Sequence, residues 1–134
     1  MRVTTTFKDD YEFQSVNEQG NVLDIDMYSG DEKKHMSPTQ LLLSGLAACA
    51  SVDLVQMLKK RKKTVNGLTV VADGTRRDEH PRVFTHIVLT FTVNSPDVTE
   101  AEFEKMGHLA ATKYCSVAGT LNAEVDHKFI VNRA

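Results

Sequence analysis

The sequence predicts an α+β fold, a single domain over residues 1–134 in which strands precede and follow one long apolar helix. Three observations predict this class. Apolar and polar residues alternate in the first 28 positions, which is the pattern of strands with one solvent-facing side. The stretch Leu41–Val55 is apolar nearly all round, which is typical of a covered helix. Strands and helices then follow in blocks, so we expect antiparallel sheets around the long helix.

Three strands and a loop are expected in the first 36 residues. Alternation marks Val3–Phe7, Tyr11–Val16 and Val22–Tyr28 as strands. In the third strand Asp26 should face water, on the side opposite the apolar residues. The polar stretch Ser29–Met36 predicts a mobile loop.

A helix should begin after Ser37, a good N-cap, with Pro38 in the first helical position. It should extend to about Lys62, roughly 25 residues. Gly45 costs helix stability, which suggests that another backbone approaches closely there. The five basic residues Lys59–Lys63 are interpreted as cations at the negative end of this helix, in preference to a nucleic-acid patch.

The second half of the chain should contain a hairpin, a helix and a last strand. Thr99 and Glu102 have the spacing of a capping box, which starts the helix. That helix either continues to Ala118 or breaks near Tyr114 and restarts. The expected strands are Val65–Arg77, Arg82–Asn94 and Ala123–Val131.

Composition excludes several classes of protein. A net charge of -2 and a pI near 6.2 argue against a dedicated nucleic-acid binder. The apolar run Leu41–Val52 is too short to cross a bilayer, and Asp53 closes it. Residues Met1–Lys8 contain no apolar signal core, so we expect a cytoplasmic location and no membrane partner.

The two cysteines are the candidate site. Cys49 lies in the middle of the apolar helix, and Cys115 lies where a second helix could begin. Buried thiols often serve as apolar packing, so a purely structural role stays open. A redox pair is the other interpretation, since amides at a helix start and nearby Lys113 would stabilise a thiolate at Cys115. Apolar surroundings disfavour a thiolate at Cys49, and Asp53 either adds to this or forms a salt bridge.

Specific motifs resemble the OsmC/Ohr family of osmotically inducible and organic hydroperoxide resistance proteins. Ser37–Cys49 is similar to the opening of that family's long helix, and Tyr114–Val117 falls where the family has its second cysteine. Arg76–Ile87 resembles an uncharacterised OsmC-like branch. The resemblance implies an intertwined homodimer, with the two long helices at its centre and the sheets wrapped around them.

The resemblance also implies a chemistry. The family's peroxidases attack an organic hydroperoxide with the first cysteine, which would be Cys49, and form a disulfide with the second, which would be Cys115. The expected substrate is a small apolar hydroperoxide, and the reductant is an external thiol, with no bound cofactor and no metal. The alternative is a protein that binds a small molecule or senses redox state without catalysis.

Three positions depart from the family's peroxidases. Thr39 stands where they have a Glu, and the early strands offer only Lys8 where they have an Arg that pairs with that Glu and the thiolate. Ser116 follows the second cysteine where they usually have Pro. Asp53 and Arg77 are therefore the candidate supporting residues. The arginines that could replace the missing cation are Arg76, Arg77 and Arg82.

Overall fold

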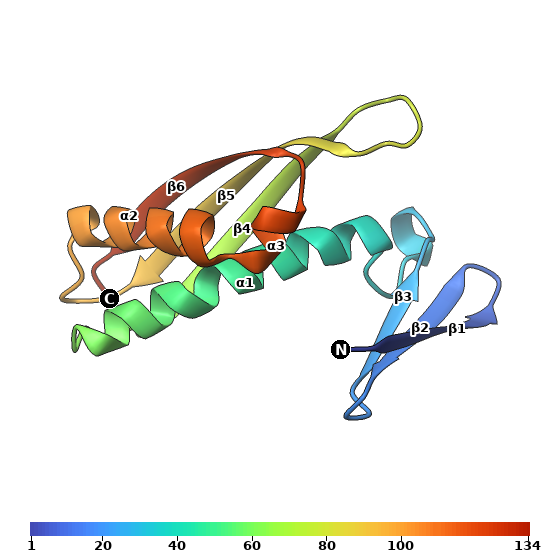
Figure 1. Ribbon diagram of the computed structural model, residues 1–134, viewed down its shortest axis with the longest axis horizontal. Helices are drawn as coiled ribbons and strands as arrows, with labels where there is room; N and C mark the ends of the chain where they lie inside the picture. Colours follow the sequence, from blue (N-terminus) through green and yellow to red (C-terminus); the bar gives the residue numbers. More distant parts are fainter. The chain divides into compact units, whose positions relative to one another are not determined.

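The computed structural model describes residues 1–134, which form two compact units, Met1–Leu42 and Leu43–Ala134. Strands and helices alternate in blocks along the chain, which confirms the predicted α+β class (Figure 1). The first unit contains β1 (Val3–Asp9), β2 (Glu12–Asn17), β3 (Val22–Asp26) and the 3₁₀ turn η1 (Gly30–Glu32). The helix α1 (Pro38–Lys60) leads into the second unit, with β4 (Gly67–Arg76), β5 (Phe84–Asn94), α2 (Glu100–Leu109), the π-helical turn η2 (Ala110–Tyr114), α3 (Ser116–Thr120) and β6 (Glu124–Asn132).

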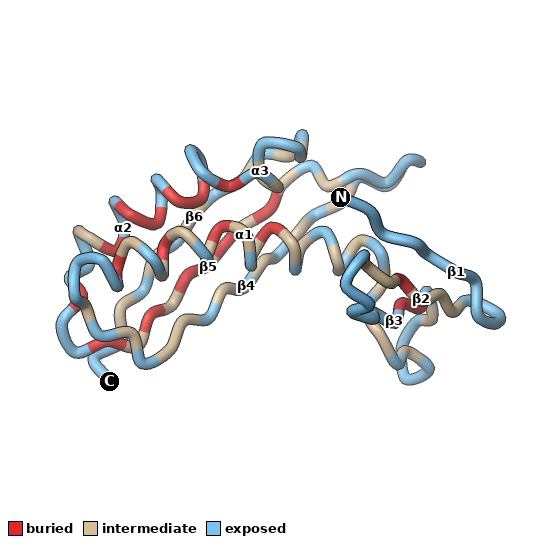
Figure 2. The backbone as a smooth tube through the Cα atoms, turned by 60° about the horizontal axis from the view of Figure 1, so that its bottom comes forward, coloured by how far each residue is buried: buried red, intermediate tan, exposed pale blue.

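The first unit is an antiparallel sheet in the order β1-β2-β3. Every residue of β1 is exposed, including Phe7 (Figure 2). Leu23 and Met27, predicted to face the core, are each 46% exposed. A sheet with so little covered apolar surface gains little from hydrophobic burial, so this unit lacks a core of its own.

The buried carboxylate of Asp26 corrects two predictions for this unit. Asp26 has no exposed surface, although the strand pattern placed it in water. It accepts hydrogen bonds from the Lys33 ammonium at 2.8 Å and from the backbone N–H groups of Lys34 (2.8 Å) and His35 (2.7 Å). Burial alone would raise the pKa of Asp26, but these donors outweigh it and hold the pKa well below its usual range. They also tether Ser29–Met36, which is therefore anchored where a mobile loop was predicted.

The ends of α1 follow from local hydrogen bonding. Ser37 Oγ accepts from the Gln40 N–H at 3.3 Å, and Gln40 Oε1 accepts from the Ser37 N–H at 2.9 Å, a reciprocal capping box. This confirms Ser37 as the N-cap. The helix ends at Lys60, two residues before the predicted end, because Lys62 adopts a left-handed φ of 59°. The N–H groups of Lys62 and Lys63 then bond back to carbonyls of the last turn.

Only one face of α1 is buried in this chain. Its fully buried residues lie four positions apart, whereas Val52 is 55% exposed and Leu42 46%. A methyl group at Gly45 would meet nothing within 4 Å, so the close contact expected there is not made within the subunit. The buried residues are Leu46, Ala50, Leu54 and Leu58.

The helix α1 is also longer than the apolar run that the sequence analysis considered. Its 23 residues are long and apolar enough to cross a membrane by length and composition alone, so the argument from length was wrong. A core helix meets the same criterion, and the buried face of α1 belongs to the main hydrophobic core of the second unit.

The second sheet is mixed, in the order β4-β5-β6. β4 and β5 form the predicted antiparallel hairpin, but β6 pairs parallel with β5 (His86 opposite Glu124, Asn94 opposite Asn132). The expectation of antiparallel pairing throughout is wrong here. The segment α2–η2–α3 carries the chain back to the starting end of β5, so the last strand runs in the same direction. The inward residues of β5, centred on Phe91, form the core with α1 and α2.

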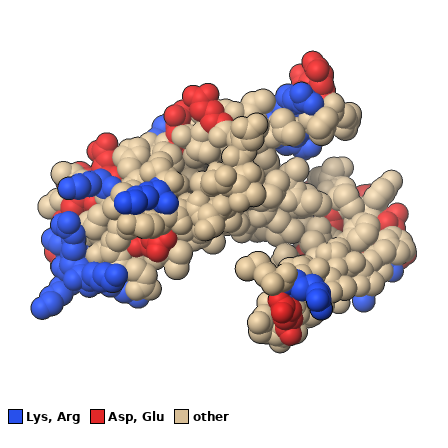
Figure 3. Space-filling model, viewed as in Figure 1, with Lys and Arg blue, Asp and Glu red and all other residues tan.

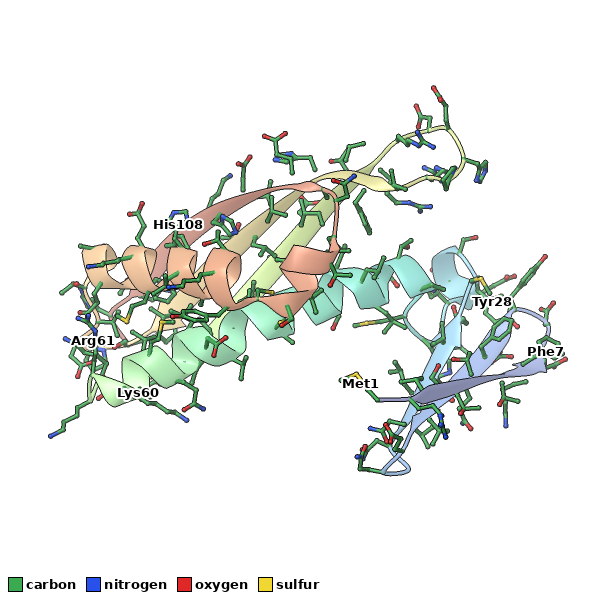
Figure 4. All side chains as sticks on the ribbon, in the orientation of Figure 1. Met1, Phe7, Tyr28, Lys60, Arg61 and His108 are labelled. Atoms are coloured by element: carbon green, nitrogen blue, oxygen red, sulfur yellow. The ribbon has the colours of Figure 1, made fainter.

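The basic run lies at the end of α1. Lys and Arg side chains gather around the end of α1 (Figure 3), where Lys60 and Arg61 are labelled in Figure 4. Lys59 and Lys60 occupy the last helical turn, where cations offset the negative end of the helix dipole. Lys63 forms an ion pair with Glu102 of α2 at 3.2 Å. These contacts agree with the structural interpretation of the basic run.

Candidate functional site

The structure brings Cys49 and Cys115 together. Cys49, half-buried on α1, and Cys115, buried between η2 and α3, are both free thiols. Their side chains lie close enough for each thiol to shift the pKa of the other. The two residues that the sequence analysis selected therefore form one site in the second unit.

A break in the helical segment places Cys115. The π-helical turn Ala110–Tyr114 ends in Cys115, whose backbone is extended (φ −78°, ψ 103°), and α3 begins at the next residue. This confirms the predicted break near Tyr114. Cys115 Sγ accepts a hydrogen bond from the Ala118 N–H at 3.4 Å and so caps α3. The first amides of α3, unpaired within the helix, are left free for a neighbouring group.

These backbone amides lower the pKa of the Cys49 thiol. The backbone N–H of Val117 is the main cause that lowers the pKa of Cys49, and burial opposes it. The Cys115 thiol and the Ser116 N–H lower the pKa of Cys49 further, whereas the negative charge of Asp53 raises it. The sum is a pKa below the usual value of a thiol. Donors to the charged form of a group stabilise that form, so these amides favour the thiolate of Cys49.

The thiol of Cys115 behaves in the opposite way. Burial raises the pKa of Cys115, and the N–H of Ala118 offsets this only in part. Hydrogen bonding and charge repulsion from Cys49 raise it further. Of the two thiols, Cys49 is therefore the one that loses its proton more readily. The sequence analysis assigned the helix-start amides to Cys115, whereas the structure gives their main effect to Cys49.

The candidate cations lie in the β4–β5 hairpin and bond to its own backbone. Arg77 is exposed, and its Nε donates to the Pro81 carbonyl at 2.7 Å. Arg76 Nε donates to the Arg82 carbonyl at 2.8 Å, and Arg82 Nε to the Arg77 carbonyl at 3.3 Å. The hairpin projects from its sheet in Figures 1 and 2. Within this chain the Cys49 thiolate is stabilised by neutral donors, and Asp53 alone of the two candidate supporting residues lies near it.

Comparison with known proteins establishes the family. Residues 30–129 match the family model described as OsmC-like protein. The chain belongs to the OsmC-like protein family. It is 36% identical over 114 residues to Protein YhfA of Escherichia coli K12, covering 85% of this chain and 84% of that protein.

Solved structures share the OsmC-like fold. An OsmC-like protein from Mycoplasma pneumoniae superposes with a TM-score of 0.86 at 22% identity, covering 98% of this chain and 96% of that one. The organic hydroperoxide resistance protein OhrB of Bacillus subtilis superposes with a TM-score of 0.64 at 19% identity, covering 98% of both chains. These similarities confirm that the single chain has the OsmC-like α+β fold.

The backbone donors are the part of this OsmC-like site that sequence reasoning missed. Side-chain motifs do not reveal them, because every residue except proline carries an N–H. One signal was present at position 116, where Ser replaces the proline of the family's peroxidases. A proline there would have no N–H to offer, whereas Ser116 has one that faces Cys49.

We expect Ser116→Pro to raise the pKa of Cys49, because the substitution removes one N–H donor to the thiolate. Proline suits the first position of α3, and Cys115 before it already has the extended backbone that proline requires. Ser116→Ala keeps the N–H and is the matched control. The measurement is the pH dependence of Cys49 alkylation by iodoacetamide, followed by peptide mass spectrometry. An unchanged midpoint in the proline variant would show that this amide does not support the thiolate.

Outside the thiol pair, four of the ionisable side chains in the second unit form two close pairs. His86 Nε2 and Asp126 Oδ2 lie 2.7 Å apart, and the rings of His108 and His127 meet edge to face at 5.3 Å. Figure 4 labels His108 on α2. No group of three or more His, Cys, Asp or Glu side chains is arranged to hold a metal ion.

Proposed function

We propose that this OsmC-like protein is a thiol-dependent peroxidase that reduces small organic hydroperoxides through Cys49 and Cys115. The observation that carries the proposal is a pair of neighbouring free thiols, of which Cys49 has a lowered pKa and Cys115 a raised pKa. The name of the Bacillus subtilis structure, an organic hydroperoxide resistance protein, supports the substrate class.

The two thiols divide the reaction between them. The Cys49 thiolate attacks the terminal oxygen of the hydroperoxide, breaks the O–O bond and becomes a sulfenic acid, and the alkoxide that leaves takes a proton to give the alcohol. Cys115 Sγ then attacks the Cys49 sulfur, which forms the disulfide and releases water. An external dithiol reduces the disulfide by thiol–disulfide exchange and is itself oxidised. The opposite pKa shifts suit this order, because the thiol with the lowered pKa, Cys49, is the better first nucleophile.

A disulfide count tests the proposal directly. One equivalent of cumene hydroperoxide per chain should remove both free thiols and leave a Cys49–Cys115 disulfide, which non-reducing peptide mass spectrometry identifies. Dithiothreitol should restore both thiols. Oxidation of Cys49 to a sulfinic acid without a disulfide would contradict a resolving role for Cys115.

A redox-sensing or small-molecule-binding protein is the second candidate. It is favoured by one observation: Asp53 raises the pKa of Cys49, and no cation of this chain counters it. A sensor would form the disulfide once but would turn over slowly with excess hydroperoxide and dithiothreitol. Steady-state hydroperoxide consumption thus separates the two candidates.

We further propose that two copies of this chain form an intertwined homodimer in the cytoplasm. Support comes from the exposed side of α1, which includes Val52, and from the uncovered strand β1 with Phe7. Burying such apolar faces against a second copy would supply the core that the first unit lacks. Two free thiols suit a reducing compartment. Nucleic acid and membrane are not proposed as partners.

We expect Val52→Lys to weaken the homodimer, because it places a charge on the exposed apolar face of α1. Light scattering after gel filtration should give twice the chain mass of 14.9 kDa for the parent and a shift toward the single-chain mass for the variant. Glu104→Lys, at an exposed position on α2, is the control and should keep the parent mass. A parent protein of single-chain mass at micromolar concentration would contradict the homodimer.

A further inference from the structure

A cavity of about 230 Å³ lies beside the segment that carries Cys115. Its walls come from α1, β5, β6 and both sides of the break between η2 and α3. Neither Cys49 nor Cys115 lines it, so it is distinct from the thiol pair. Its aliphatic lining includes Leu46, Leu89, Ala111, Ala118 and Val125.

Two polar side chains, Thr112 and His127, also line the cavity. Thr112 Oγ1 donates its proton to the His108 carbonyl at 2.6 Å, so its lone pairs remain free to accept a hydrogen bond. The half-buried ring of His127 has its centroid 6.4 Å from that of Phe91 and 5.3 Å from that of His108. Burial, with a smaller contribution from His108, lowers the pKa of His127, which disfavours its charged form. No Asp, Glu, Lys or Arg lines the cavity. The cavity thus offers hydrogen bonds but no charge.

We propose that this cavity binds an uncharged, one-ring aromatic alcohol of the phenol class, with its ring against the aliphatic wall and its hydroxyl between Thr112 and His127. A cavity of about 150 Å³ lined by apolar residues holds benzene, so this volume admits one ring with a small polar substituent. A charged ligand would lose its hydration without a counter-ion in the wall. This ligand site is additional to the proposed peroxidase function and does not depend on it.

The wild-type protein tests the site by NMR with phenol and with benzene. Phenol should shift the amides of Ala111, Ala118 and Val125 saturably, with a Kd on the order of 1 mM for so small a ligand. His127→Phe keeps an aromatic ring in the same place but removes its nitrogens. It should raise the Kd of phenol by about 5- to 10-fold, which is the effect of one lost hydrogen bond, and leave the Kd of benzene unchanged.

Ala123→Leu, at the residue just before β6, fills the cavity and should abolish binding of both ligands, whereas Ala101→Leu, at an exposed position on α2, should change the binding of neither. The proposal is overturned if wild-type shifts do not saturate or lie elsewhere, or if Ala123→Leu still binds. Equal loss of phenol and benzene in His127→Phe would overturn recognition of the hydroxyl. If a variant does not fold, the wild-type titration alone decides whether phenol binds in this cavity.

Discussion

Cys49→Ser is expected to abolish turnover of cumene hydroperoxide with dithiothreitol as reductant. The rate should fall by at least about three orders of magnitude, to the background reaction of the dithiol alone. The N–H groups of Val117 and Ser116 stabilise a thiolate, but a serine hydroxyl remains protonated at neutral pH and forms no sulfenic acid. The measurement is loss of hydroperoxide in the steady state, at matched protein concentration.

Cys115→Ser is the matched control, because it keeps the nucleophile and removes only the second thiol. Its first oxidation should stay within about tenfold of the parent, and the Cys49 sulfenic acid should persist long enough for dimedone to trap it. A Cys49→Ser protein that turns over at the parent rate would remove this thiol from the proposed reaction. A Cys115→Ser protein that never yields a sulfenic acid would contradict the division of roles.

Local signals in the sequence predicted most of the elements of the fold. Ser37 and Pro38 marked the start of α1, and Thr99 with Glu102 marked the start of α2, because caps depend on residues only three positions apart. The break near Tyr114 was one of two alternatives, since periodicity alone does not distinguish a continuous helix from a π-helical turn followed by a restart.

Features that depend on distant contacts were not predictable in the same way. Asp26 has the alternation of a solvent-facing residue, yet donors eight and nine positions later enclose its carboxylate. The direction of β6 depends on the end of β5 to which the α2–α3 segment returns the chain. The alternation of residues within β6 gives no information about that direction. In both cases tertiary contacts decide against the local pattern.

The position of the two thiols also depends on contacts between distant parts of the chain. The expectation that Cys49 and Cys115 meet came from the resemblance to a family, because no periodicity brings together residues so far apart in the chain. Arg77 was expected to replace the arginine that the family's peroxidases have, whereas in the structure backbone N–H groups favour the Cys49 thiolate. Such donors are fixed by the position of α3 and not by residue type.

The packing of α2 on β6 has no tolerance for a side chain at Gly107. A methyl group there would lie 2.0 Å from Cε1 of Phe129, and 2.7 and 2.8 Å from Cζ and Cδ1 of the same ring. The ring cannot easily move aside, because Phe91 stacks on it at 5.0 Å and Phe103 meets its edge at 5.6 Å. Gly107 is therefore the residue that allows the helix and the strand to approach.

We expect Gly107→Ala to destabilise the protein by about 2 kcal/mol, because overpacking a core of this kind costs about 1–3 kcal/mol. The gain in helix propensity from glycine to alanine, up to about 1 kcal/mol, offsets only part of the cost. Thermal unfolding should show a Tm lower by about 5–10 °C. The double variant Gly107→Ala with Phe129→Leu should lose less stability than the two single losses added, since the smaller side chain relieves the clash. A Tm at or above that of the parent in Gly107→Ala would show that the Phe129 ring yields freely, and that the close approach of α2 to β6 is not set by glycine.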